Sequence, residues 1–416
     1  MINRLLEHGT MITGDCTFHR TEDDYRKYSD DCLKNAISSN TISQDDANLI
    51  KEFIVETQAI SHISVGRAYK LEYQLIKLCG FIGPFLKASP MDVYAGIDRL
   101  KSYKQPKNDE KYSQITVIDM VKLLKRFYIW LYDNGKLPED YKIEKIRKIK
   151  GGTGKTTKTA EQLLSQEEVK RMIEETPTSR DRALIAVLYD SGCRVGELAT
   201  MNWNQVKYHP QYAILNTDAK TGKGRTIRLG FSVPYLKQWQ NDYPGGNPGP
   251  DDLVFCHRRK RGQMVTYHGT AKMLKGVAER AGINKRFTPH LFRHSRVTDL
   301  LQEGYSEPYV KMSMWGSMST NMLSTYSHLV DVDLDDEFKR KTGIEPEKKP
   351  EDSALHVVQC PHCAEICPPT ATHCPNCWKP LTEAAQETQN NLIEMLGQVA
   401  RENPEALIQA LKGISQ

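Results

Sequence analysis

Three short motifs, far apart in the sequence, constrain the fold of this chain most, because a working fold must bring them together. They are SGCRVGEL with Arg194, TPHLFRHSR with His290 and Arg293, and TYSHL with Tyr326. Guanidinium groups hold the non-bridging oxygens of a phosphodiester through rigid, paired hydrogen bonds. A tyrosine hydroxyl, with a reference pKa of about 10, must lose its proton as it attacks phosphorus. The motifs therefore predict a phosphoryl-transfer site in which Tyr326 is the nucleophile.

The leaving oxygen of such a reaction needs a proton, which a lysine or histidine within hydrogen-bond reach can supply. Residues 213–230, AILNTDAKTGKGRTIRLG, alternate apolar and polar positions on either side of a Thr-Gly-Lys-Gly turn. This pattern is typical of a β-hairpin. We expect the hairpin to hold Lys220 over the scissile phosphate as the general acid, with Lys223 as the alternative donor.

Together, Arg-x-Gly-Glu-Leu, a lysine in a hairpin turn, His-x-x-Arg and Tyr-x-His resemble the catalytic set of the tyrosine recombinases, also called phage-type integrases. The resemblance is strong from Leu164 to Leu334 and looser before it. It implies these roles: the phosphate clamps Arg194 and Arg293, the general acid Lys220, the proton-handling imidazole His290, the supporting carboxylate Glu197 and the nucleophile Tyr326. It also implies a metal-independent DNA strand transferase that works through a 3′-phosphotyrosyl intermediate and a Holliday junction.

One position departs from the family pattern, which usually has a Gly-His or Gly-Trp pair about nine residues before the tyrosine. Here Ser317 has that spacing, and Trp315 lies two residues earlier. We predict that Trp315 takes the catalytic position, because its indole N–H is a donor that suits a phosphate. The alternative is that Trp315 is a core aromatic residue. His294 and His328 are expected to support the site or simply to pack near it.

The resemblance implies double-stranded DNA at specific recombination sites as the partner, with a homo-tetramer on synapsed DNA. Within this chemistry we expect an integrase that inserts and excises a mobile element or virus. Xer-like resolution of chromosome or plasmid dimers, and relaxation of DNA as in type IB topoisomerases, would use the same residues. A non-catalytic DNA-binding protein with the recombinase fold is the alternative from another class.

Charge is unevenly distributed along the chain. The formal net charge is +5, but residues 207–311 carry 18 basic and 8 acidic side chains, a surplus of +10, whereas residues 331–416 carry 8 basic and 15 acidic ones, or −7. A basic surface displaces counterions from a phosphate backbone. The part of the chain that holds the candidate catalytic residues therefore has the charge expected of a DNA-binding surface.

Cysteines point to a metal site rather than to disulfides, because five of the ten crowd into one short segment. That segment, CPHCAEICPPTATHCPNC, contains two Cys-x2-Cys pairs separated by ten residues. Two such pairs supply four thiolates to a tetrahedral ion. We expect a zinc ribbon with one structural zinc ion held by Cys360, Cys363, Cys374 and Cys377. Cys367, His362 and His373 are expected to be bystanders. Combined with the catalytic motifs, the ribbon resembles archaeal-type integrases.

Upstream of the catalytic motifs, apolar residues recur at helical spacing after an N-cap-like start at Ser43. We predict a multidomain, mainly α fold with a small β-sheet (α+β), which contains an N-terminal helical SAM-like core-binding domain, a tyrosine-recombinase catalytic domain and a C-terminal zinc ribbon. The expected order is an N-terminal arm of uncertain structure (1–40), the helical core-binding (DNA-binding) domain (41–141), a basic interdomain linker (142–162), the catalytic domain (163–345), the zinc ribbon (355–381) and C-terminal helices as an oligomerisation element or a self-docking segment (382–416).

The linker contains GGTGKTT, which invites a phosphate-loop interpretation. That interpretation fails because the required glycine five residues before Gly154 is Ile149, and no strand-like run precedes it. We therefore expect no nucleotide. We also expect no catalytic metal, because the resemblance to tyrosine recombinases implies a metal-independent reaction. No stretch approaches the ~20 apolar residues that span a bilayer, and no signal pattern opens the chain, so we expect no membrane association and a cytoplasmic, nucleoid-associated protein.

Overall fold

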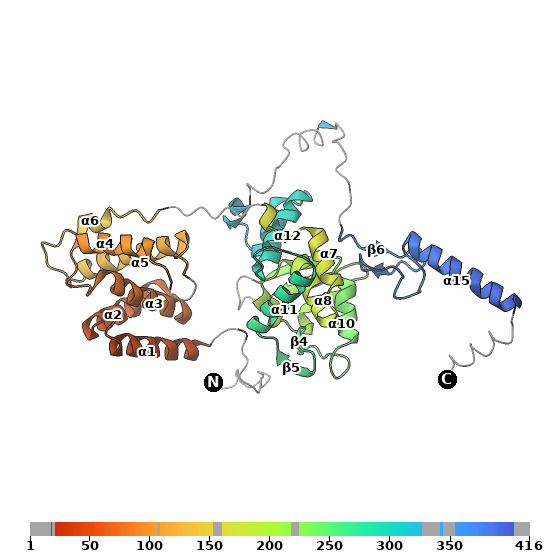
Figure 1. The fold of residues 1–416 in the computed structure, drawn as a ribbon, viewed down its shortest axis with the longest axis horizontal. Helices are drawn as coiled ribbons and strands as arrows, with labels where there is room; N and C mark the ends of the chain where they lie inside the picture. Colours follow the sequence, from red (N-terminus) through yellow and green to blue (C-terminus); the bar gives the residue numbers. More distant parts are fainter. Residues whose placement is uncertain are drawn as a thin grey trace, which may run out of the picture. The chain divides into compact units, whose positions relative to one another are not determined.

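The computed structural model describes residues 18, 21–105, 109–152, 160–217, 224–326, 342–343 and 354–402. The chain divides into two compact units (Figure 1). One comprises residues 19–157, and the other comprises residues 158–416 together with residues 1–18. Most of the regular structure is helical, with short antiparallel strands in the second unit, as the sequence predicts. Among the described residues, no helix is both long enough and apolar enough to span a membrane.

The first unit is helical. Its helices are α1 (Glu22–Ser38), α2 (Gln44–Ser61), α3 (Val65–Ile82), α4 (Pro90–Ser102), α5 (Gln114–Asp133) and the short α6 (Ile143–Arg147). Each of the first five begins at a serine or threonine whose side chain accepts a hydrogen bond from the backbone of the first turn. This satisfies a donor that the helix leaves unpaired. Ser43, predicted from the sequence to start a helix, caps α2.

Aromatic side chains fill the core of this unit. Phe53 of α2 meets the edge of Phe127 of α5, with ring centroids 5.1 Å apart, and Phe85 meets the same ring at 4.8 Å. The three phenylalanine side chains are at most 2% exposed. Helix α1, which falls within the predicted N-terminal arm, packs against α3. The packing of α1 makes residues 22–38 part of the folded unit.

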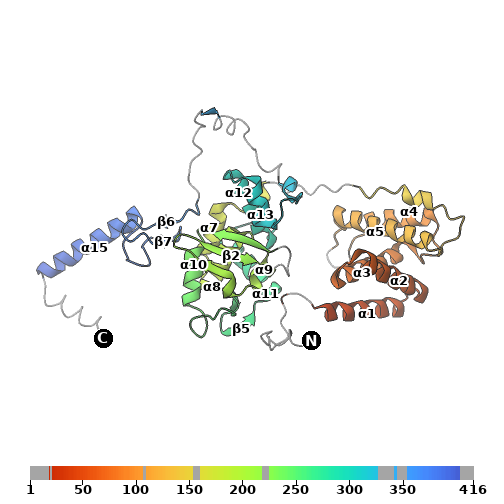
Figure 2. The ribbon, with the colours of Figure 1, turned by 180° about the vertical axis from the view of Figure 1, so that it is seen from behind.

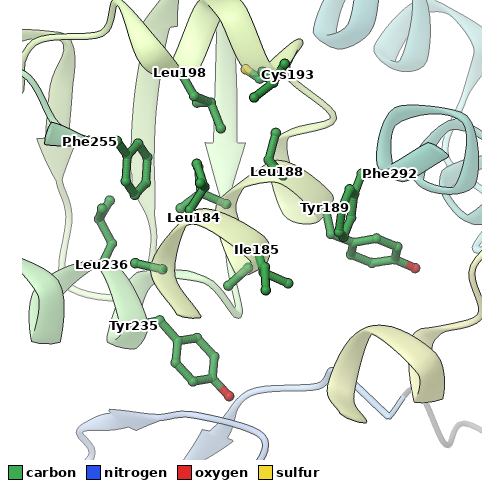
Figure 3. Packing of buried hydrophobic residues seen from close by; sticks show 14 of the residues in the cluster. Leu184, Ile185, Leu188, Tyr189, Cys193, Leu198, Tyr235, Leu236, Phe255 and Phe292 are labelled. Atoms are coloured by element: carbon green, nitrogen blue, oxygen red, sulfur yellow. The ribbon is translucent and has the colours of Figure 1, made fainter. Parts of the chain in front are cut away.

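The second unit is built around α8 (Ser179–Ser191), which is buried along nearly its whole length. Figure 3 shows its side chains among those of Leu198, Leu236, Phe255 and Phe292, which come from different elements. The other helical segments are η1 (Ala160–Gln162), α7 (Gln166–Glu174), α9 (Val195–Ala199), η2 (Trp203–Gln205), α10 (Val233–Asn241), α11 (Tyr267–Arg280), α12 (His290–Gln302), α13 (Glu307–Trp315) and η4 (Met322–Thr325). Helices α12 and α13 lie side by side (Figure 2).

A three-stranded antiparallel sheet lies beside α8, in the order β1 (Val206–Tyr208), β2 (Ala213–Thr217) and β3 (Arg225–Leu229). Strands β2 and β3 form the predicted hairpin, in which Thr217 is paired with Arg225. A two-stranded ribbon follows, made of β4 (Cys256–His257) and β5 (Lys260–Met264). Buried residues alternate with exposed ones along β3, so Arg225, Ile227 and Leu229 share its inner face.

The C-terminal part has two short strands, β6 (Val358–Gln359) and β7 (Ile366–Cys367), which are paired antiparallel, and the helix α15 (Glu383–Glu402). The segment around β6 and β7 contacts α10 of the same unit. The Tyr235 hydroxyl lies 2.9 Å from Oγ1 of Thr370, and Lys237 donates to Glu365 at 3.3 Å. The cysteine-rich segment is thus held against the α10 surface by polar contacts.

Candidate active site

The first motif lies where α8 ends and α9 begins. Gly192 ends α8 in the left-handed conformation, with φ of 56°. The positive φ favours glycine, and a Cβ atom built on it would come within 2.7 Å of Sδ of Met314, so that the end of this side chain would have to shift. The turn carries the chain directly into Arg194, the N-cap residue of α9. Arg194 is exposed, with 43% of its side chain accessible to solvent.

Glu197 organises this end of the site. One of its oxygens accepts from the backbone N–H of Arg194 at 2.7 Å, and the other accepts from Nη1 of Arg194 at 3.0 Å. Arg225 of β3 donates to both oxygens, at 2.9 and 2.7 Å. Burial acts to raise the pKa of Glu197. The hydrogen bonds and charge of Arg225, followed by the backbone hydrogen bond and charge of Arg194, outweigh burial and lower this pKa. The carboxylate therefore stays ionised and orients both arginines.

Arg293, from the second motif, lies in the buried turn of α12 that faces Gly192. It is 4% exposed, and its guanidinium donates to the carbonyl oxygen of Gly192 at 2.7 Å and to that of Met314. The guanidinium carbon lies 5.4 Å from the ring centroid of Trp315. Burial, with added repulsion from Arg225 and Arg194, lowers the pKa of Arg293 to about 10. The repulsion shows that the positive charges of the first two motifs act on one another.

Tyr326 lies directly after the 3₁₀ helix η4 and is 3% exposed. Its hydroxyl is 2.6 Å from Nδ1 of His294, and its ring centroid is 6.2 Å from that of Trp315. Burial raises the pKa of Tyr326, while the charge of Arg293 lowers it. The predicted nucleophile thus lies among groups from α12 and α13, within the electrostatic reach of the predicted clamp.

The structure brings most of the predicted catalytic residues together. Arg194, Glu197, Arg293, Trp315 and Tyr326 are linked by the contacts above. His290 begins α12, is exposed, and has its ring centroid 6.1 Å from that of His294. Three other candidate residues, Lys220, Lys223 and His328, lie outside the described residues.

The departure from the family spacing also has a structural description. Trp315 is the last residue of α13, and Gly316 ends that helix with a left-handed conformation. The indole is partly buried between Arg293 and Tyr326. Ser317, which has the usual spacing, pairs with Ser319, with 3.0 Å between their hydroxyl oxygens. Trp315 therefore lies beside the predicted nucleophile and packs against the apolar cluster that contains it, a position that suits both the catalytic role and the alternative of a core aromatic residue.

Sequence reasoning missed Arg225 and gave His294 little weight. A signal for Arg225 was present, because it occupies an inward position of the alternating strand 225–229, next to Ile227 and Leu229. A charged residue on the buried face of a strand needs a buried partner of opposite charge. For His294, nothing in the sequence shows that the tyrosine hydroxyl lies on its ring, because the two residues are brought together by the turn after α13.

The four cysteines of the two Cys-x2-Cys pairs also come together. Their sulfur atoms all lie within 4.8 Å of one another. The two pairs have the same local geometry. The carbonyl oxygen of Cys360 accepts from the backbone N–H of Ala364, and that of Cys374 accepts from Trp378. Both donors have a positive φ. Among the described residues, Cys367, His362 and His373 are not part of this group. A donor set of four clustered thiols fits a tetrahedral zinc ion.

A family model described as "Phage integrase family" matches residues 162–332. A tyrosine recombinase XerD of Listeria innocua serovar 6a is 30% identical over 226 residues, which cover 52% of this chain and 72% of that protein. Transposase A from transposon Tn554 of Staphylococcus aureus is 28% identical over 196 residues, 45% of this chain and 54% of the transposase.

Solved structures share the fold at low sequence identity. The XerH site-specific recombinase, bound to a palindromic difH substrate in a post-cleavage complex, gives a TM-score of 0.52 at 16% identity, covering 79% of this chain and all of that one (100%). A lambda integrase dimer bound to a COC′ core site gives 0.51 at 14% identity, covering 73% of this chain and 99% of the other. These similarities concern the arrangement of elements that positions the site.

Proposed function

The chain belongs to the phage integrase family and is a tyrosine site-specific recombinase, and we propose that it integrates and excises a mobile element or virus by cutting and rejoining DNA at specific sites. The proposed partner is double-stranded DNA, bound by four copies on two synapsed sites. The relatives support a role with mobile DNA, because one is a transposase and a structural neighbour is the integrase of transposon Tn1549.

The observation that carries this proposal is the surplus of positive charge around Glu197 and Arg293, because the charge of Arg293 acts on the buried Tyr326. Among the described residues of the site, three guanidinium groups, those of Arg194, Arg225 and Arg293, interact with one carboxylate, that of Glu197. A site with this surplus is suited to an anion, and preorganised cations stabilise the charge that develops when a phosphodiester is attacked. Tyr326 is the nucleophile placed beside that charge.

In the proposed mechanism each catalytic residue has one role. Arg194 and Arg293 hold the scissile phosphate, with His290 and Trp315 as further donors to its oxygens. Tyr326 attacks phosphorus, which forms a 3′-phosphotyrosyl bond and breaks the bond to the 5′-oxygen, and Lys220 protonates that oxygen. The 5′-hydroxyl of a partner strand reverses the step. Two rounds of exchange then pass through a Holliday junction.

The other segments support DNA binding in this proposal. We assign the helical unit, which in the structure extends from α1 to α6, to the grip on the duplex. The basic residues of the predicted linker (142–162) would contact the DNA backbone. Residues 163–345 would be the catalytic domain, 355–381 the zinc ribbon, and 382–416 a segment for contact between neighbouring copies. Cys360, Cys363, Cys374 and Cys377 would bind one structural zinc ion, whose four protein ligands leave no open position for catalysis.

A second role, resolution of chromosome or plasmid dimers, is favoured by the similarity to XerD. It would use the same chemistry on sites in host or plasmid DNA. Recombination between two copies of a single candidate site on one circular plasmid would show resolution. Recombination that needs one site from the element and another from the host would show integration.

A suicide-substrate assay tests the proposed chemistry. Nicked duplexes with candidate sites are incubated with the wild-type protein and with Tyr326→Phe, in the presence of a chelator, and are separated on denaturing gels. We expect a 3′-linked protein–DNA adduct with the wild type alone. Tight DNA binding without an adduct at any site would instead indicate a non-catalytic DNA-binding protein. Synthetic Holliday junctions distinguish a recombinase, which resolves them into recombinant products, from an enzyme that only relaxes supercoiled DNA.

A further inference from the structure

The Tyr326 hydroxyl is in contact with a histidine to which sequence reasoning gave little weight. Nδ1 of His294 lies 2.6 Å from the hydroxyl oxygen. The ring centroids are 5.6 Å apart, and the rings are inclined by 38°. This distance is typical of a strong hydrogen bond that involves a hydroxyl group. The atom that must lose a proton during attack is therefore in direct contact with an atom that can accept one.

Both partners are held in place by regular structure. His294 lies on α12, directly after Arg293, and its carbonyl oxygen accepts from the Thr298 hydroxyl at 3.2 Å. The backbone N–H of Tyr326 donates to the carbonyl oxygen of Leu323 at 2.9 Å, and the tyrosine ring packs in a small apolar cluster with Leu323. The contact thus joins two supported residues, which is what a positioned catalytic pair requires.

We propose that His294 is the general base that takes the phenolic proton when Tyr326 attacks the scissile phosphate. This assignment rests on the proposed function. In it, His294 is the tautomer with the proton on Nε2, so that Nδ1 accepts. As the Tyr326 oxygen bonds to phosphorus, its proton moves to Nδ1, and the electrons of the broken P–O bond leave with the 5′-oxygen, which Lys220 protonates. In the reverse step the imidazolium returns its proton to the leaving phenol.

His290 is less suited to this step. It is exposed at the first turn of α12, whereas His294 is one turn further along and contacts the hydroxyl directly. The need for a base is strong, because burial raises the pKa of Tyr326 even though the charge of Arg293 opposes this. His290 retains its proposed role as a donor to the phosphate oxygens, and His294 accepts the phenolic proton.

The test compares two substrates. One is the natural suicide substrate, and the other carries a bridging sulfur in place of the 5′-oxygen, so that the leaving thiolate needs no proton. The variants are His294→Ala, which removes the contact, and His294→Asn, whose amide can hold the hydroxyl but cannot take its proton. Lys220→Ala serves as the variant that lacks the general acid. His209→Asn, in an exposed turn between β1 and β2, is the matched control.

We expect both His294 variants to form the adduct on the order of 100-fold more slowly than wild type at equal DNA occupancy. The sulfur substrate should rescue Lys220→Ala but neither His294 variant. For each variant, the ratio of rates on the two substrates does not depend on the fraction of folded protein. A near-wild-type rate for His294→Asn, or rescue of His294→Ala by the sulfur substrate, would overturn the assignment. If wild type forms no adduct, the proposed function itself fails.

Discussion

Arg225 grips both carboxylate oxygens of Glu197, with N–O distances of 2.9 and 2.7 Å, and the two side chains are 2% and 3% exposed. The same carboxylate accepts hydrogen bonds from the backbone N–H and the guanidinium of Arg194, whose side chain is 43% exposed. A buried ion pair between β3 and α9 therefore fixes the orientation of the more exposed Arg194. Since the sequence places Arg225 just after the segment that holds Lys220, this pair also ties the hairpin to the first motif.

Replacing Arg225 should weaken both stability and cleavage. Arg225→Ala leaves the carboxylate of Glu197 buried without its main partner, and we expect a loss of about 3–5 kcal/mol in the free energy of unfolding. Arg225→Lys keeps the charge but lacks the bidentate fork of the guanidinium. We therefore expect it to be more stable than Arg225→Ala but still to cleave DNA more slowly than wild type. Urea unfolding and adduct formation measure the two effects. Arg228→Ala, on the exposed face of the same strand, should change stability by no more than about 0.5 kcal/mol.

Gly192→Ala should disturb the clamp through the backbone. The residue has φ of 56°, and the new Cβ would come within 2.7 Å of Sδ of Met314. Because Gly192 supplies the carbonyl oxygen that Arg293 contacts, a shift of this turn moves the guanidinium. We expect a loss of roughly 1–3 kcal/mol in stability, measured by urea unfolding, and slower adduct formation. In Gly276→Ala in α11, the nearest atom to the new Cβ is Nη1 of Arg280, at an ordinary contact distance of 3.8 Å, so this change should be neutral or slightly stabilising. An equal loss of stability there would contradict this explanation.

Much of the fold follows from local sequence signals. Ser43 marks the start of α2 because a serine three residues before an aspartate satisfies two backbone donors at once. The hairpin of β2 and β3 follows from alternation around a glycine-rich turn. The sequence does not predict helix α1, because this helix depends on packing against α3 as well as on its own few apolar residues.

The site is less predictable, since its geometry depends on long-range packing. Arg194, Arg293 and Tyr326 could be recognised because the chemistry needs these residue types in this order. The position of the Trp315 indole depends on where α13 ends, and the sequence spacing to Tyr326, which differs from the usual family spacing, does not reveal that end. The partners of Arg225 and His294 lie 28 and 32 residues away in sequence. Contacts at such separations leave no local periodic signal.

The cysteine group predicts a metal-dependent fold for residues 355–381. Cys374→Ser should lower bound zinc from one ion per chain toward none, because three thiolates and a hydroxyl bind zinc weakly. Plasma emission spectrometry of purified protein measures the metal content. Cys367→Ser, which changes a buried cysteine outside the group, should keep the ion. Retention of a full equivalent of zinc by Cys374→Ser would show that this set of ligands is wrong.

Glu72 predicts a pH-dependent stability of the helical unit. Its side chain lies between α1 and α3, where the Ser29 hydroxyl donates to one oxygen at 2.7 Å, while the other has no hydrogen-bond partner among the described residues. Burial raises the pKa of Glu72 from 4.5 to about 7, against the smaller effects of Ser29 and Lys51. The native state therefore holds this proton to a higher pH than the unfolded state does.

The sign of the effect follows from that difference. Between the unfolded and folded pKa values the native state binds more protons, so stability falls as pH rises from 4.5 to about 7 and is level above it. The loss should approach about 3 kcal/mol. Glu72→Gln keeps the shape without the charge, so its unfolding transition should lose this slope and occur at higher temperature above pH 7. Calorimetry across this range tests it, with the exposed Glu139→Gln as control; an unchanged slope in Glu72→Gln would assign the pH dependence to other groups.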